Sequence, residues 1–229
     1  MRAMFARTTG LTLILAALFA TPAAAQPALT LPLKDCYVVA RQDQREQIDI
    51  HAVGFTPLRP VELYIDDILQ YEGPALADGS IEGLLRAPYH EEGSRPFELR
   101  IAEAGRPANT IVEHSMVTRL AITQTPSRAS TNQRVRFKGR GFMNFDAPVY
   151  AHYVFAGKVR KSVRLAVPTR PCGGFTVRRK QFPFKKAPKI GTWTIQFDQN
   201  PHYDPKAAVR VPMTIKVRRT PKQASARAR

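Results

Sequence analysis

Apolar and polar residues alternate one by one through much of this chain. Residues 48–55 read IDIHAVGF and residues 135–142 read VRFKGRGF. A period of two places successive side chains on opposite faces of a β-strand. Turn-forming residues separate the alternating runs at short intervals, and no segment after residue 26 keeps a helical period. The pattern therefore predicts an all-β protein made of short strands.

The two halves of the chain repeat the same order of features. Both alternating runs end in Gly-Phe, at Gly54-Phe55 and at Gly141-Phe142, which lie 87 residues apart. Glycine permits positive φ where a strand ends, and we expect the phenylalanine to plug the end of a sandwich. Both runs continue through a short loop into Pro-Val, at residues 60–61 and 148–149. Two unrelated β segments of similar composition are the alternative to a repeat.

The repeat divides the chain into two units of about the size of one immunoglobulin-like sandwich. We expect an acidic sandwich over 26–118 and a basic sandwich over 119–218, with little linker near Arg119. The segment Gly139-Arg140-Gly141-Phe142 resembles the opening of bacterial extracellular immunoglobulin-like domains of the IPT/TIG kind. Residues 52–55, Ala-Val-Gly-Phe, depart from that motif. The resemblance covers residues 30–218 and implies an immunoglobulin-like fold and an extracellular location, but no catalytic residues.

Residues 1–25 have the pattern of a secretory signal peptide. Arg2 and Arg7 precede an apolar run at 11–20, and Ala23-Ala24-Ala25 offers a cleavage site. We expect this segment to be cleaved and the protein to be secreted, extracellular or associated with the cell envelope; an uncleaved anchor is the alternative. No later apolar stretch approaches eighteen residues, so no transmembrane segment is expected in the mature chain. Residues 219–229 are expected to form a basic flexible tail.

The chain has two cysteines, Cys36 and Cys172, one in each predicted sandwich. In an oxidising compartment, two cysteines usually pair. We expect an intramolecular bond that joins the two sandwiches in one relative orientation. Two free thiols, or pairing between molecules, are the alternatives.

Charge is divided unequally between the halves. Residues 26–118 contain 8 Lys and Arg against 15 Asp and Glu, whereas residues 119–229 contain 25 against 3. A surface so rich in cations attracts polyanions. The acidic half of one copy could also meet the basic half of another, or pack on its own basic half. The alternative is an ordinary solvated surface that is rich in arginine and binds no polyanion.

Within the predicted strands, the cations alternate with apolar residues and therefore share faces. We expect them to form a positive plate, provided that the strands are neighbours. The residues around 158–164 are expected to present Lys158, Arg160 and Arg164 on one face, together with Ser162. The predicted polyanion-binding residues are Arg134, Arg136, Lys138, Arg140, Lys158, Arg160, Arg164, Arg178 and Lys180.

Motifs of catalysis are scarce in this sequence. There is no Gly-x-Ser-x-Gly elbow, His-Glu-x-x-His or P-loop. We expect no enzyme activity, no cofactor, no metal site and no specific nucleic-acid binding. Aromatic residues such as Tyr150, Tyr153, Phe155 and Tyr203 could stack on sugars, but strand spacing favours packing. The favoured function is a non-catalytic binding protein whose basic half holds an anionic cell-wall or extracellular polymer. The alternative is a structural or adhesive spacer that binds proteins or itself through strand edges.

Overall fold

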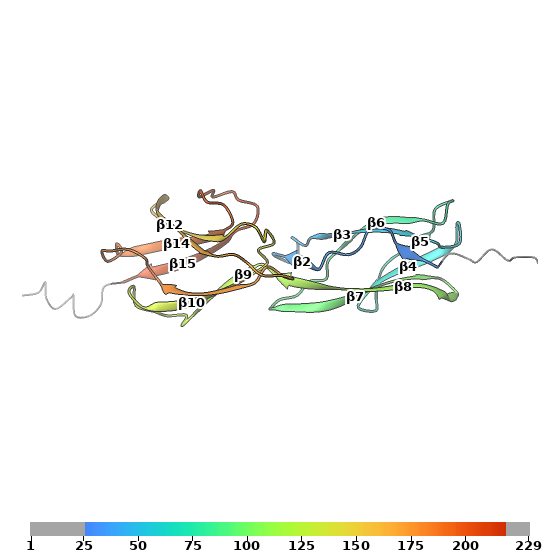
Figure 1. Cartoon of the computed structure of the whole chain (residues 1–229), viewed down its shortest axis with the longest axis horizontal. Coiled ribbons are helices and arrows are strands. Elements are labelled where there is room, and N and C mark those ends of the chain that lie inside the picture. Colours follow the sequence, from blue (N-terminus) through green and yellow to red (C-terminus); the bar gives the residue numbers. More distant parts are fainter. Residues whose placement is uncertain (1–25, 219–229) are drawn as a thin grey trace, which may run out of the picture.

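The structure, a computed structural model, describes residues 26–218, and every regular element in that range is a β-strand (Figure 1). The predicted signal peptide and the predicted basic tail lie outside these residues. The all-β prediction is confirmed. No helix in the described range could span a membrane.

The amino-terminal sandwich is made of two sheets. Strands β1 (Ala28–Leu29), β3 (Gln47–Val53) and β6 (Ile81–Arg86) form a three-stranded sheet in that order. The facing sheet has five strands, in the order β2 (Cys36–Val39), β8 (Arg106–Arg119), β7 (Ser94–Glu103), β4 (Pro60–Ile65) and β5 (Ile68–Pro74). All pairings are antiparallel except that of β2 with β8, which is parallel.

The carboxy-terminal sandwich also has two sheets. One contains β9 (Ala121–Thr125), β10 (Arg134–Arg140) and β13 (Phe175–Lys180), with β10 in the centre. The other runs β12 (Lys158–Ala166), β11 (Val149–Phe155), β14 (Gly191–Asp198) and β15 (Val211–Val217). The edge strands β12 and β13 lie beside one another at one rim of this sandwich.

Two separate cores follow from the alternation in the sequence. In β3, Ile48 and Ile50 are fully buried, and in β10 so are Val135 and Phe137, while their neighbours along each strand are exposed. Removing each such side chain from water contributes about 1.5–3 kcal/mol. Shifting either strand by one residue would place its polar set in the core, so burial fixes the register.

Both Gly-Phe pairs do what the sequence predicted. Gly54 and Gly141 have φ of 93° and 83°, and Phe142 is fully buried. Each phenylalanine N–H donates to the carbonyl of a second glycine: Phe55 to Gly79, and Phe142 to Gly173. A Cβ on either partner glycine would overlap the phenylalanine backbone. The same hydrogen bond, from the phenylalanine N–H to a glycine in a neighbouring loop, therefore closes one end of each sandwich. We call the loop that carries the partner glycine, Gly79 or Gly173, the clasp loop.

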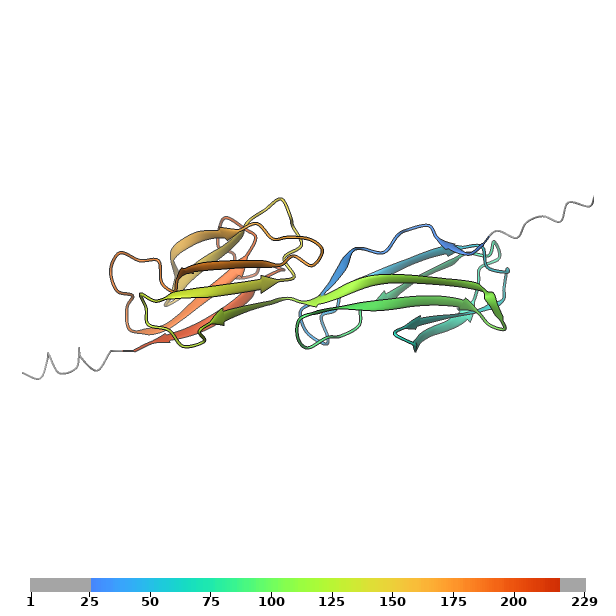
Figure 2. The same cartoon turned by 60° about the horizontal axis from the view of Figure 1, so that its bottom comes forward.

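The two sandwiches lie end to end, and the chain passes from β8 into β9 through a single residue, Leu120 (Figure 2). The N–H of Leu120 donates to the carbonyl of Val39 at 3.0 Å. The predicted disulfide between Cys36 and Cys172 is present and ties β2 to the clasp loop of the second sandwich. Because the junction joins ends rather than faces, the acidic half does not pack over the faces of its own basic half.

Candidate functional site: a cationic plate on the second sandwich

Strands β10 and β13, which carry six of the nine predicted cations, are direct neighbours. Arg136 lies opposite Arg178, and Arg134 lies opposite Lys180. These four side chains are exposed on the outer face of the sheet. Val135, between Arg134 and Arg136, and Val177, just before Arg178, point toward the core, whereas Arg179, opposite Val135, is exposed. The outer face continues along β10 with Lys138 and Arg140 toward the junction. We call these six residues the plate.

On the edge away from β13, the plate ends at strand β9, which carries uncharged residues there. Opposite Arg136 and Lys138, strand β9 presents Thr125 and Thr123 on the same face. Along β10, alternate residues are about 7 Å apart, so Arg134 and Arg140 lie about 20 Å apart. Among the described residues, none of the nine predicted cations forms an ion pair. The one ion pair found there between the two sandwiches joins Arg170 to Asp35 at 3.6 Å, and both side chains are largely exposed.

The three remaining cations lie on β12, in the other sheet, and the predicted shared face for them is wrong. Tyr153 pairs with Lys161 but Val154 pairs with Val159, so Arg160 is an extra residue in a β-bulge. A bulge inverts the alternation beyond it. Arg164 therefore faces outward from β12, whereas Lys158 lies opposite Phe155, on the side of the strand that faces the core.

A loop that the prediction left out joins the plate to β12. Residues 181–190 connect β13 to β14 and line two adjoining hollows, of about 650 and 340 Å³. Arg134, Arg178 and Lys180 line the larger, and Arg160 lines the smaller. We call the pair the distal hollows. The two hollows share Phe184 and Lys185; their further cations are Arg179, Lys186 and Lys189.

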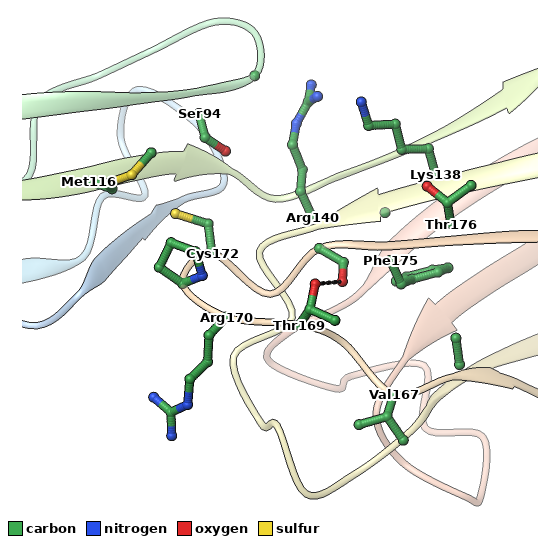
Figure 3. Close-up of a pocket in the computed structure, with 15 residues that line it drawn as sticks. Ser94, Met116, Lys138, Arg140, Val167, Thr169, Arg170, Cys172, Phe175 and Thr176 are labelled. Carbon is green, nitrogen blue, oxygen red and sulfur yellow. Dashed lines mark hydrogen bonds between the residues drawn. The ribbon is translucent and has the colours of Figure 1, made fainter.

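At its other end, the plate reaches the junction between the sandwiches. A cleft of about 570 Å³ lies there, lined by Lys138 and Arg140 from β10 and by Ser94 and Met116 from the first sandwich. In Figure 3, the Lys138 and Arg140 side chains extend to the same side of the ribbon. Arg170 extends the other way, and its guanidinium lies 4.5 Å from the centre of the Phe145 ring. The cleft is therefore the junction end of the plate.

A hydrogen-bonded Ser-His-Asp array, which the sequence did not reveal, lies on the outer side of β11, β12 and β14. Ser162 Oγ is 2.7 Å from His152 Nδ1, and His152 Nε2 is 3.2 Å from Asp198 Oδ1 and 3.1 Å from the Asn200 carbonyl. Both partners of Nε2 are acceptors, so Nε2 carries a proton. The His152 and Asp198 side chains are 0% exposed. Ser162 is exposed, so the array links a buried imidazole and carboxylate to a hydroxyl at the surface of β12.

The Asp198 carboxylate holds the loop that follows β14. Burial raises its pKa, but hydrogen bonds from His152, Gln196 and the Asn200 N–H outweigh burial and leave the pKa below its usual value. Tyr203, from the same loop, lies against the His152 ring with centroids 5.8 Å apart. The other aromatics named in the sequence analysis also pack on neighbouring rings: Tyr150 on His152, Tyr153 on Phe182 and Phe155 on Trp193.

In residues 26–218, no group of three or more His, Cys, Asp or Glu side chains is placed to hold a metal ion. Asp204, one of the oxygen-bearing residues near this loop, accepts from the Lys206 N–H. Chemically, the plate offers five exposed cations and the half-buried Arg140, none of which has an anionic partner among residues 26–218.

Comparison with known proteins gives only distant likenesses. No protein-family profile matches the chain, and no curated protein matches it. The crystal structure of Rst D1-D2 aligns at 10% identity and TM-score 0.31, over 84% of this chain and 99% of that one. SGBP-B from the Bacteroides ovatus mixed-linkage glucan utilization locus, solved with a heptasaccharide, aligns at 14% and 0.26, over 85% and 47%. The central fibronectin-III array of RIM-binding protein aligns at 11% and 0.25, over 82% and 69%. Likeness at this level says nothing about what the chain binds.

Proposed function

We propose that this protein is a secreted, non-catalytic binding protein that holds an anionic extracellular or cell-envelope polymer on the plate. The observation that carries the proposal is the pairing of like charges across β10 and β13. Arg136 faces Arg178 and Arg134 faces Lys180, with no acidic side chain paired to any of them among the described residues. Like charges placed directly opposite destabilise a sheet, and a bound polyanion removes that cost.

The shape of the plate supports a polymer rather than a compact ligand. Cations recur about every 7 Å along β10, and the row extends from the junction cleft to the distal hollows. A chain with regularly spaced anionic groups can lie along this row and contact several cations at once. Such binding is mainly electrostatic, so it weakens steeply as salt rises.

Secretion and an IPT/TIG-type relationship belong to the same proposal. The Cys36–Cys172 disulfide is the kind of bond that persists in oxidising compartments. The Gly139-Arg140-Gly141-Phe142 segment ends β10 in the manner of that domain type, with Phe142 sealing the end of the core.

The experiment is a salt titration of binding to dextran sulfate, a polyanion of high charge density. We expect log K to fall linearly with log salt, and Arg136→Gln to weaken binding and reduce the slope by about 1. Lys206→Gln, which removes an exposed lysine outside the plate, is the matched control. Binding that is insensitive to salt, or equal losses in both variants, would contradict the proposal.

A second candidate function rests on strand β5. This strand pairs only with β4, and its free edge exposes Ile68 at 65%, Leu69 at 48% and Tyr71 at 49%. Exposed apolar edge strands pair readily with other strands, which favours a spacer that binds proteins or itself. Self-association that persists in high salt and is lost in Leu69→Lys would favour this candidate.

A further inference from the structure

The distal hollows combine two properties that the flat plate lacks: an apolar floor and a dense cationic rim. Phe184, Pro188 and Trp193 line them together with cations, and no acidic side chain is among their lining residues. The cations of the rim are Arg134, Arg160, Arg178, Arg179, Lys180, Lys185, Lys186 and Lys189. Such a combination suits a ligand that has both an apolar face and an anionic group.

The floor is held rigidly. The Phe184 ring packs against Trp193 at 5.3 Å and against Tyr153 at 5.7 Å between centroids. The Trp193 Nε1–H donates to the Lys189 carbonyl at 2.9 Å, and Lys161 Nζ donates to the Pro183 carbonyl at 2.8 Å. A loop anchored at both ends loses little conformational entropy when a ligand binds.

The rim, in contrast, is free to meet a ligand. Lys185, Lys186 and Lys189 are exposed, and none of them forms an ion pair among the described residues. The volumes of the two hollows, about 650 and 340 Å³, fall within the range of small-ligand sites. One ring of a polymer can therefore enter while the rest of the chain lies along the plate.

We propose that the distal hollows bind an acidic sugar residue, so that the polymer held by the plate is an acidic polysaccharide. The C–H face of the sugar ring packs on Phe184 and Pro188, and its anionic substituent meets Lys185, Lys186 or Lys189. This inference rests on the proposed function, because it names the class of polymer. A polyphosphate chain has no ring to place on the floor, whereas a nucleic acid has stacking bases and is the competing outcome of the test.

Trp193 is the chain's only tryptophan, so its fluorescence reports on the distal hollows directly. Full-length protein is titrated with tetragalacturonate, with inorganic tetraphosphate, and with a single-stranded tetranucleotide. We expect tetragalacturonate alone to give a saturable change in emission. Lys186→Gln with Lys189→Gln should weaken that binding about tenfold or more. Lys206→Gln should leave the emission change intact, since Lys206 lines neither hollow.

The outcomes separate this inference from the proposed function. Retention on dextran sulfate without any Trp193 response to tetragalacturonate would overturn the inference and leave the plate in place. An equal response to tetraphosphate would mean that the sugar ring does not contribute to binding. A stronger response to the tetranucleotide would mean that the distal hollows prefer nucleic acid to an acidic sugar. If the unsubstituted protein failed to bind dextran sulfate at every salt concentration, the proposed function itself would be contradicted.

Discussion

Replacing Arg136 with threonine should make the free protein more stable while it weakens polyanion binding. Arg136 and Arg178 are directly opposite in an antiparallel pair, on the same exposed face. In such a pair the Cβ atoms are about 4.5–5.5 Å apart, and like charges there destabilise the sheet by about 0.2–1 kcal/mol. Threonine keeps the strand preference and matches Thr123 and Thr125 on the neighbouring strand β9.

That free energy corresponds to a rise in melting temperature of about 1–8 °C for a sandwich of this size. The assay is thermal unfolding followed by circular dichroism, at 0.01 M and at 1 M salt. The Debye length falls from about 30 Å to about 3 Å between these conditions, so the gain should be present in the first and absent in the second. Arg136→Lys keeps the charge and serves as the control.

Two results would refute the reasoning. A lower melting temperature for Arg136→Thr at 0.01 M salt would mean that packing by the arginine stem outweighs repulsion. An equal gain at both salt concentrations would mean that the effect is not electrostatic. If the prediction holds, the plate is retained at the expense of folding stability, as expected of a surface kept for binding.

Three further predictions concern the framework that carries the plate. Gly141→Ala should lower the free energy of unfolding of the second sandwich by about 2–4 kcal/mol, because φ is 83° and a Cβ would lie 2.9 Å from the Leu120 backbone. Gly157→Ala is the control: φ is 72° but the space around it is open, so the loss should be only about 1 kcal/mol. Equal losses for the two variants in urea unfolding would contradict this prediction. Replacing both Cys36 and Cys172 should lower the free energy of unfolding by up to about 5 kcal/mol, which is the loop-closure entropy for 136 residues. Two free thiols, titrated in the unsubstituted protein after unfolding without a reductant, would disprove the bond. The pKa of Asp198 is lower in the folded than in the unfolded state, so its contribution to stability is present above its unfolded pKa and is lost as pH falls toward the folded value; Asp198→Asn should flatten that part of the curve of stability against pH.

The alternation in the sequence was sufficient to predict which side chains face the core. Residues 135 and 137 are buried and residues 134, 136 and 138 are exposed, as a period of two requires. The same local rule failed in β12, because the bulge at Arg160 is set by pairing with β11 and not by the residues around it.

The order of strands in space was beyond the reach of the sequence. Arg136 and Arg178 are 42 residues apart in the chain, and only the sheet pairing makes them neighbours. The distal hollows depend in the same way on a loop that packs against Trp193, and the run Lys185-Lys186 was the one local signal that pointed to it. The His152 array joins three strands, so no spacing in the sequence marks it.

By itself, the sequence determined the all-β class, the two similar halves, the uneven division of charge and the face on which each cation of β10 lies. These properties follow from local rules, because strand geometry repeats every two residues and net charge is a sum over the chain. The tertiary structure decided which charged strands are adjacent, how loop 181–190 links them, and that the halves meet end to end. Each of these depends on contacts between residues that are distant in the sequence, where burial and hydrogen bonding, and not the local pattern, select the partner.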